Sequence, residues 1–194
     1  QHLFDADRET DFRILNSELS VRNSKFGPYI FYKTEKMKKP KFFDLKGLMK
    51  SAYYDPNPVV MLEHKGLYWS KIKGTEDART IEPDEDYVIP FGKARMVLEA
   101  EGGQKESSLT VITYGMGVYW AKSAARNFPG RIEIVDLRTL VPLDEATVFA
   151  SVRKHGRCLV VTEEPVRNSF AQALAGNISQ QCFHKLDAPV CVIG

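Results

Sequence analysis

From residue 91 onward, short apolar runs alternate with longer stretches whose apolar positions recur at helical spacing. The runs, each typical of a buried strand, cover residues 109–113, 132–135, 158–161 and 190–193. Helices are predicted between them over about 118–127, from Asp144 to about 156, and from about Ser169 onward. Such alternation is typical of βαβ units. We therefore expect an α/β domain with a mostly parallel sheet, covered by helices on both faces and joined by right-handed crossovers.

A smaller pattern occupies residues 43–69. Apolar positions at helical spacing predict a helix that Asp44 is placed to cap, and Pro56 and Pro58 break the chain after it. The apolar run 59–62 then predicts a short buried strand. One helix and one strand cannot bury both of their faces, so we expect this stretch to be the tail of another domain.

The stretches on either side of this pattern are polar. Residues 1–42 are weakly patterned, with one short helix indicated over 7–19, and they receive no functional assignment. Residues 70–90 contain Gly74, Pro83, Pro90 and an acidic cluster, which together predict a linker. The sequence stops directly after the apolar run 190–193, and an uncovered apolar edge is avoided in folded proteins. We expect further chain or a partner to cover that edge.

Composition limits the classes of function. Of the 194 residues, 43% are hydrophobic and 27% are charged, and the net charge is only +2. No overall field therefore favours nucleic acid or an anionic membrane. The basic run 33–41 is interpreted as a solvated segment. No apolar stretch approaches the roughly 18 residues of a membrane helix, and the amino end lacks a signal-peptide pattern, so we expect a soluble protein.

The three cysteines, Cys158, Cys182 and Cys191, all lie inside apolar segments, and no C-x-x-C pair is present. Reduced cysteine in such surroundings behaves as a small hydrophobic side chain. We therefore expect thiols in a reducing compartment, with no zinc or redox site built from them.

A glycine-rich turn, Gly115-Met116-Gly117, follows the run 109–113 and precedes a helix, where phosphate-binding loops lie. Trp120 stands where the G-x-G-x-x-G pattern has its third glycine, and no G-x-x-x-x-G-K-[ST] pattern occurs. We therefore expect these glycines to serve backbone geometry rather than to bind a nucleotide.

Polar side chains at the predicted strand ends are the remaining candidates. His64 is interpreted as a structural residue at a domain boundary, although an imidazole could also act as a general acid or base. Asp136 and Arg138 anchor a turn or cross a subunit boundary, for which the planar guanidinium suits Arg138. Glu163 and Glu164 offer two carboxylates, but without a histidine or second acid at useful spacing they form no recognisable acid/base pair.

Two further histidines, His155 and His184, lie at predicted helix C-termini. The helix dipole favours partial positive charge there, and we take this as a sufficient reason for both. The motifs G-x-S-x-G and H-E-x-x-H are absent. The residues alone thus predict an α/β domain without a self-contained active site.

Five segments resemble, in the same order, the β subunits of thiamine diphosphate-dependent 2-oxo acid dehydrogenases. They are the D-L-K-G-L…D-P-N-P-V-V…E-H-K series within 44–65, Y-V-I-P-F-G-K-A at 87–94, I-T-Y-G at 112–115, V-D-L-R-T-L-V-P-L-D at 135–144 and L-D-A-P-V at 186–190. The resemblance covers about residues 43–194. The sequences of these motifs are most similar to those of the branched-chain, or 2-oxoisovalerate, members, although pyruvate and acetoin members share the motifs.

The resemblance implies a domain arrangement. Residues 91–194 would form a three-layer αβα domain like the C-terminal domain of transketolase, and residues 43–69 the tail of a pyrimidine-binding domain. Residues 70–90 would be the linker between them, and residues 1–42 stay unassigned. The family's cofactor-activating glutamate and its histidine near the lipoyl entrance both precede the segment that begins at Asp44, and neither can be placed here. We therefore expect no catalytic, cofactor-binding or metal-binding residue in this chain.

The resemblance also implies partners. Such a β subunit pairs with an α subunit and a second β subunit, and the full enzyme binds thiamine diphosphate with Mg²⁺, which carries the decarboxylation chemistry. The acyl group passes to a lipoyl arm on the acyltransferase core. We expect this chain alone to bind no cofactor, and to serve subunit assembly and acyltransferase docking. No nucleic acid or membrane is expected, and the location would be the cytoplasm, or the mitochondrial matrix in a eukaryote.

One residue receives a specific role from the resemblance. Asp187 matches an acidic position that contributes to acyltransferase docking in some members, whereas from the residues alone it is equally a cap for the turn before Pro189. Two other functions stay open. The chain could be the C-terminal domain of a transketolase or deoxyxylulose-phosphate synthase, which should show phosphate-binding Arg and His residues, or a non-catalytic interaction module.

Overall fold

The computed structural model describes residues 19–24, 27–32, 45–69, 72–78, 86–101 and 108–194. The chain divides into two compact units, Gln1–Lys41 and Phe42–Gly194. In the first, β1 (Leu19–Ser24) and β2 (Gly27–Tyr32) form an antiparallel hairpin. The hydrophobic pattern did not predict this hairpin, and the helix expected over 7–19 falls outside the described residues but for its last position.

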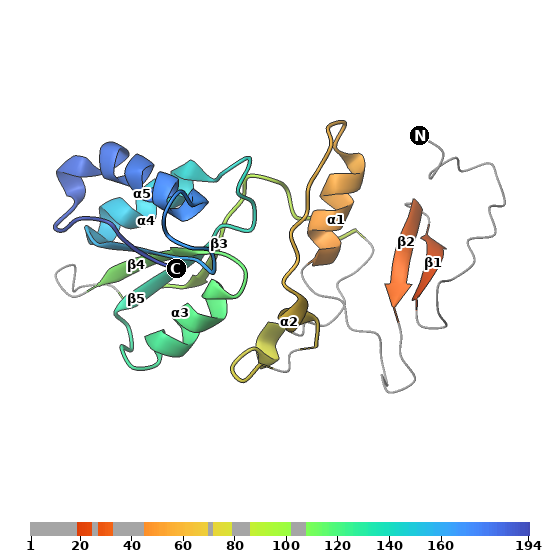
Figure 1. Ribbon diagram of the computed structural model, residues 1–194, viewed down its shortest axis with the longest axis horizontal. Coiled ribbons are helices and arrows are strands. Elements are labelled where there is room, and N and C mark those ends of the chain that lie inside the picture. Colours follow the sequence, from red (N-terminus) through yellow and green to blue (C-terminus); the bar gives the residue numbers. More distant parts are fainter. Residues whose placement is uncertain (1–18, 25–26, 33–44, 70–71, 79–85, 102–107) are drawn as a thin grey trace. The chain divides into compact units, whose positions relative to one another are not determined.

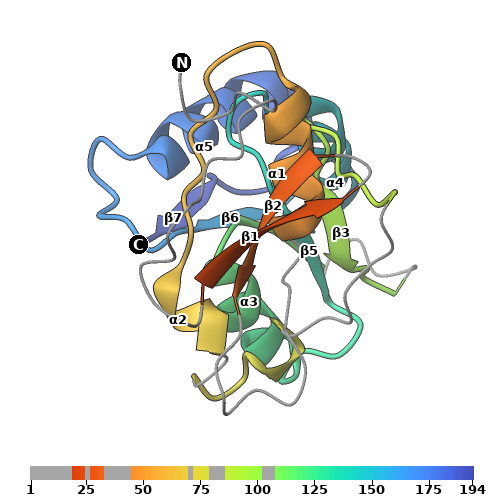
Figure 2. The same ribbon diagram turned by 90° about the vertical axis from the view of Figure 1, so that its right-hand side faces the viewer.

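The second unit contains a five-stranded sheet in the order β3-β5-β4-β6-β7. Its strands are β3 (Arg95–Leu98), β4 (Leu109–Thr113), β5 (Ile132–Asp136), β6 (Cys158–Val161) and β7 (Cys191–Ile193). Strands β4 to β7 run parallel, and β3 runs antiparallel to β5. In the turned view of Figure 2, β3 and β7 lie at opposite edges of the sheet. The mostly parallel sheet is confirmed, and β3 is an addition that the apolar runs did not predict.

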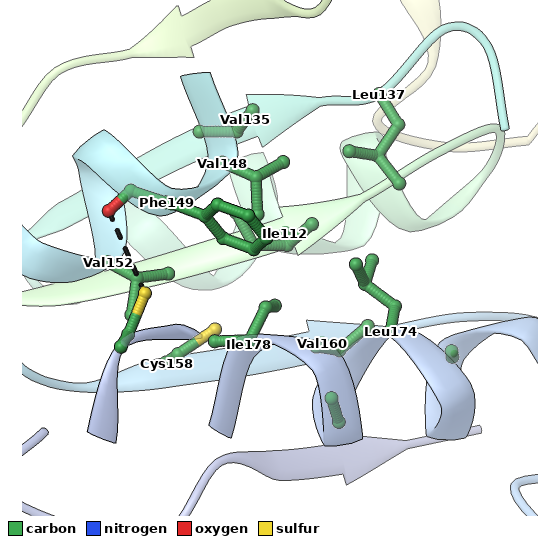
Figure 3. Close-up of a cluster of buried hydrophobic side chains, with 13 residues drawn as sticks. Ile112, Val135, Leu137, Val148, Phe149, Val152, Cys158, Val160, Leu174 and Ile178 are labelled. Carbon is green, nitrogen blue, oxygen red and sulfur yellow. Dashed lines mark hydrogen bonds between the residues drawn. The ribbon is translucent and has the colours of Figure 1, made fainter. Parts of the chain in front are cut away.

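Helices cover both faces of this sheet (Figure 1). Helix α3 (Gly117–Ala125) packs on one face, while α4 (Glu145–His155) and α5 (Phe170–Gln181) pack on the other. Alternate strand residues serve the two layers: Val111 belongs to the cluster beneath α3, and Ile112 to the larger cluster beneath α4 and α5 (Figure 3). The expected three-layer αβα architecture is confirmed.

Local signals place the ends of these helices. The Asp144 carboxylate accepts a hydrogen bond from the Thr147 amide at 3.2 Å and so caps the start of α4. Gly156 ends α4 in the left-handed conformation, at φ 73°. The Ser169 hydroxyl caps α5 by accepting from the Gln172 amide at 3.0 Å. A short 3-10 turn (Phe183–Lys185) follows α5 and leads to β7.

Helix α1 (Leu45–Tyr54) forms where the apolar spacing predicts it. The strand expected at 59–62 is wrong, because this stretch has no regular structure and exposes Val60 by 85% and Leu62 by 86%. A strand needs a hydrogen-bonded neighbour, and in the described part of the chain none lies beside it. A short helix, α2 (Lys65–Trp69), and a 3-10 turn (Glu76–Ala78) come next.

The segment before β3 is anchored on α1. The Ile89 amide donates to the Gly47 carbonyl at 3.2 Å, and the Ser51 hydroxyl donates to the Ile89 carbonyl. The Ile89 side chain is only 3% exposed, and a Cβ on Gly47 would lie 2.6 Å from it, so this contact requires glycine. This end of the predicted linker therefore packs as part of the fold.

Two simpler expectations can also be followed in the structure. Cys158 and Cys182 are buried, and Cys191 is exposed on edge strand β7. Location in an apolar segment therefore correctly indicated burial for two of the three thiols. Burial raises the pKa of the Cys158 thiol to about 12. Within the described residues, no helix has the length and apolar character needed to cross a membrane.

Candidate functional site at the carboxyl edge of the sheet

The topology marks one place on the sheet for function. The crossover through α3 carries the chain from β4 to β5 on one side, whereas the crossover through α5 carries it from β6 to β7 on the other. Open parallel sheets bind ligands where neighbouring strands send their connections in opposite directions. The loops that follow β4 and β6, at 114–116 and 162–169, meet at this switch point.

A hydrogen-bond cluster closes the inner part of the switch point. The Tyr114 hydroxyl lies 2.8 Å from both Thr162 Oγ1 and Glu164 Oε1. The Ala171 amide, in the first turn of α5, donates to the same Glu164 oxygen at 3.2 Å. Burial, together with the negative charge of Glu164, raises the pKa of Tyr114 to about 12, so the phenol stays protonated and donates to the carboxylate. Glu164 thus occupies the position at which a helix N-terminus could receive an anionic ligand.

His64 reaches the outer part of the same switch point. Its Nε2 lies 3.0 Å from Glu163 Oε1, with the two side chains 29% and 39% exposed. Gly66 makes room for the ring, since a Cβ there would lie 2.9 Å from His64 Cε1. The other ring nitrogen, Nδ1, is buried and has no hydrogen-bond partner among the described residues. The sequence interpretation found no histidine for Glu163, because its partner lies far away in the chain.

The glycines of the loop after β4 serve close packing, as the sequence indicated. Gly115 adopts φ 57°, a conformation that side-chain-bearing residues rarely adopt. A Cβ on Gly117 would collide with Thr113 Oγ1 and lie 3.3 Å from the Val161 carbonyl oxygen. The loop is therefore pressed against β6, and its backbone geometry accounts for both glycines.

Asp136 and Arg138 lie at the same carboxyl edge, at and just beyond the end of β5. The Arg138 amide donates to Asp136 Oδ1 at 3.1 Å and closes a turn in which Arg138 adopts φ 57°. This agrees with the turn-anchoring interpretation. A role of either side chain in a subunit boundary stays a prediction.

The loop that follows, up to Asp144, receives the segment that leads into β3. The Gly92 amide donates to Thr139 Oγ1 at 3.0 Å, and the Ala94 amide donates to Asp144 Oδ2 at 3.0 Å. Asp144 therefore serves two elements, because it also caps α4. Desolvation raises the pKa of this carboxyl, but hydrogen bonds from the Ala94 and Thr147 amides and the Thr147 hydroxyl outweigh it, so the net shift is downward.

Asp187 lies at the opposite, amino edge of the sheet, beside the end of α4. Its amide donates to the Gly156 carbonyl at 2.7 Å, and its side chain is exposed. A Cβ on Gly156 would lie 2.7 Å from Asp187 Oδ2, so the carboxylate rests directly on this glycine. The four residues selected from the sequence thus separate, with His64, Asp136 and Arg138 at one edge and Asp187 at the other.

The interpretation of His155 needs correction. This residue does end α4, but it is only 4% exposed, and its Nε2 lies 3.2 Å from an oxygen of Glu133, which is 1% exposed. The helix dipole is therefore not a sufficient reason for it, because a buried carboxylate is its immediate neighbour. A signal was present in the sequence: Glu133 interrupts an otherwise apolar strand, Ile132-Glu133-Ile134-Val135.

In the part of the chain that the structure describes, no three or more His, Cys, Asp or Glu side chains gather in a way that could hold a metal ion.

Residues 98–194 match the protein family described as the C-terminal domain of transketolase. The chain belongs to this family. The match spans β4 to β7 and the helices between them, and so includes the switch point and Asp187.

Curated relatives extend the comparison beyond this domain. The 2-oxoisovalerate dehydrogenase subunit beta of Bacillus subtilis is 38% identical over 151 residues, which cover 76% of this chain and 42% of that protein. The pyruvate dehydrogenase E1 component subunit beta of Rhizobium meliloti is 36% identical over 153 residues, covering 77% and 30%. The acetoin:2,6-dichlorophenolindophenol oxidoreductase subunit beta of Cupriavidus necator is 38% identical over 151 residues, covering 76% and 40%.

Two facts follow from these relatives. The chain spans less than half the length of each of them. The identities are also nearly the same for three differently named enzymes, so identity alone does not select a substrate.

Proposed function

We propose that this chain is part of the β subunit of a thiamine diphosphate-dependent 2-oxo acid dehydrogenase, in which residues 42–194 serve assembly and partner docking. The observation that carries the proposal is that the chain's own side chains occupy the switch point. Where a sheet of this topology would receive a ligand, the chain places its own Glu164 at the start of α5 and its own His64 against Glu163. A domain with this place filled, in a family whose relatives are named as β subunits, is suited to holding other parts together.

The proposal extends to the domain arrangement. Residues 43–69 act as the tail of a pyrimidine-binding domain, and residues 91–194 form the transketolase-like domain that carries it. His64 against Glu163 joins the two parts directly, and Ile89, at the end of the linker, packs against α1. In the full enzyme, thiamine diphosphate with Mg²⁺ would bind between the α subunit and the pyrimidine-binding domain, and it would supply the decarboxylation chemistry there.

The substrate is proposed to be a branched-chain 2-oxo acid. The ordered motifs, taken together, support this because their sequences are most similar to those of the branched-chain members. The sugar-phosphate alternative is disfavoured, because the helix terminus that could bind a phosphate is neutralised by the Glu164 carboxylate.

Docking of the acyltransferase core is assigned to Asp187. Its carboxylate is exposed beside the C-terminus of α4, where the helix dipole adds negative potential, and the site therefore suits a cationic group on the partner. Asp136 and Arg138, at the far edge of the sheet, are assigned to contacts between subunits.

The experiment uses the native β subunit co-expressed with its α subunit. Oxidation of 2-oxoisovalerate, pyruvate and acetoin is measured by reduction of an artificial electron acceptor, and binding of the acyltransferase core is measured in the same preparation. We expect 2-oxoisovalerate to be the best substrate. Asp187→Asn should leave decarboxylation unchanged and weaken core binding about tenfold, with less weakening at high salt. No thiamine-dependent turnover of any of the three would refute the enzyme assignment, and unchanged core binding would refute the docking assignment.

A further inference from the structure

A buried charge network lies at the amino edge of the sheet, beneath the last turn of α4. Glu133, on β5, is 1% exposed. The Ser151 hydroxyl donates to its Oε1 at 2.7 Å, and the Lys154 ammonium donates to its Oε2 at 2.6 Å. His155 Nε2 lies 3.2 Å from the same Oε2. All three neighbours of the carboxylate come from one turn of one helix.

A second strand joins the network. The Thr110 hydroxyl, on β4, lies 2.9 Å from the Ser151 hydroxyl and donates to the Ser151 carbonyl at 3.1 Å. Desolvation raises the pKa of Glu133, but hydrogen bonds from Lys154 and Ser151, together with the nearby His155 ring, outweigh it and lower the net pKa, so the carboxylate is ionised at neutral pH. The His155 Nε2 itself has no hydrogen-bond partner of good geometry among the described residues. The end of α4 is fixed to two adjacent strands by the directional contacts of Ser151 and Lys154.

Stability alone gives little reason for such a charge. Replacing a buried ion pair with well-packed apolar side chains is often neutral or stabilising, whereas removing one partner is costly. Directional hydrogen bonds fix the position of the groups that they join more closely than apolar packing does. Here they fix the position of the last turn of α4.

Gly156 and Asp187 lie at the end of that turn. Gly156 directly follows His155, adopts φ 73°, and accepts the Asp187 amide at 2.7 Å. The Asp187 carboxylate rests on its α-carbon, where a Cβ would lie 2.7 Å from Oδ2. The position of the Asp187 carboxylate therefore depends on the position of Gly156. The position of Gly156 depends in turn on where α4 ends.

We propose that Glu133, with Ser151 and His155, is a positioning residue that holds Asp187 through Gly156. The importance of that position for a partner rests on the proposed docking function, whereas the coupling itself is a property of this chain and can be tested without a partner.

The first test measures amide hydrogen exchange in the full chain. In Glu133→Gln, we expect the Asp187 amide to exchange at least tenfold faster relative to the Ile112 amide in the centre of β4. This ratio is the decisive readout, because a merely structural role would accelerate both amides equally. Glu145→Gln, on the first turn of the same helix, is the matched control and should leave the ratio unchanged. Ser151→Ala removes the hydroxyl that contacts Glu133 and Thr110 but keeps the buried carboxylate, and it serves if Glu133→Gln does not fold. An unchanged ratio in both network variants overturns the proposal.

The second test is a double-mutant cycle on binding of the acyltransferase core by the assembled enzyme. Ser151→Ala should weaken binding several-fold when Asp187 is present and should have no further effect in Asp187→Asn. Equal effects in both backgrounds would overturn transmission through Asp187. If Asp187→Asn by itself leaves binding unchanged, the docking function fails, and the exchange experiment still decides the coupling.

Discussion

The two edges of the five-stranded sheet carry polar clusters of different kinds. At the carboxyl edge, His64 and Glu163 meet with 29% and 39% of their side chains exposed, and they join segments far apart in the sequence. At the amino edge, Glu133 and His155 meet with 1% and 5% exposed and join a strand to the helix that directly follows it. Solvent screens the first pair and not the second, so similar chemistry at the two edges should differ strongly in energy.

The difference shows how the family's fold is used here. At the carboxyl edge, where such sheets place ligands, the ion pair between two parts of the unit is partly exposed. At the amino edge, which carries the proposed docking residue, the charged network is centred on a buried carboxylate. The more deeply buried charges therefore lie at the edge where the proposed partner binds.

The largest expected effect is at the amino edge. Glu133→Ala leaves His155 buried beside an empty space and removes the acceptor of Ser151 and Lys154. We expect the free energy of unfolding to fall by about 3 kcal/mol in urea titrations. Glu145→Ala, on the exposed first turn of α4, should cost less than about 0.5 kcal/mol. A loss below about 1 kcal/mol for Glu133→Ala would contradict the contrast between the edges.

A smaller effect is expected at Asp144, on the carboxyl edge, which accepts hydrogen bonds from two elements. Asp144→Ala removes the cap of α4 and the acceptor of the Ala94 amide together. We expect a loss of about 2 kcal/mol in thermal or urea unfolding, near the upper end for a single cap. Asp144→Asn keeps one acceptor oxygen and should recover part of the loss. Equal losses for the two variants would show that the hydrogen bonds are not the cause.

The pH dependence of stability sharpens the comparison further. The pKa of Glu133 is lowered in the folded chain from the ordinary value of 4.5, so the unfolded chain binds its proton first as the pH falls. Its stabilisation is complete above about pH 4.5 and is lost as the pH falls through the lower, folded value. In Glu133→Gln, unfolding free energies measured between pH 6 and 3 should fall less steeply than in the unaltered chain. Parallel curves would exclude Glu133 as a source of the acid sensitivity.

The smallest effect is expected for the exposed pair. Glu163→Gln should change the free energy of unfolding by less than about 1 kcal/mol, because both side chains contact water and salt screens them. The same substitution should increase amide exchange in Lys65–Trp69 more than in β4, since it loosens a joint rather than the sheet. A loss as large as that of Glu133→Ala would remove the distinction between the two edges.

Much of the fold follows from local pattern. The apolar runs that became β4, β5 and β6 were visible because strands buried on both faces contain few polar positions, and Asp144 and Ser169 marked the helix starts. The run that became β7 is apolar as well, although this edge strand is partly exposed. Strand β3 escaped, since four partly exposed residues beginning with Arg95 do not form an apolar run.

The contacts of the candidate site could be predicted less well from the local sequence pattern. The His64–Glu163 contact depends on how two separate segments pack, which spacing in the chain does not encode. The run at 59–62 was misjudged because apolar composition cannot tell a paired strand from an unpaired extended segment. Glu133 could have been found, because a carboxylate within a strand buried on both faces demands a partner.

The anchoring of the segment before β3 has a mechanical consequence. Ile89 is fixed to α1, and Gly92 is fixed to the loop that follows β5, so only Pro90 and Phe91 lie between the two attachments. Two residues leave almost no slack, and the proline ring removes one of the few torsions that remain. A displacement of α1 should therefore be transmitted directly to the Asp136–Asp144 loop, because the connecting segment is too short and too restricted to absorb it.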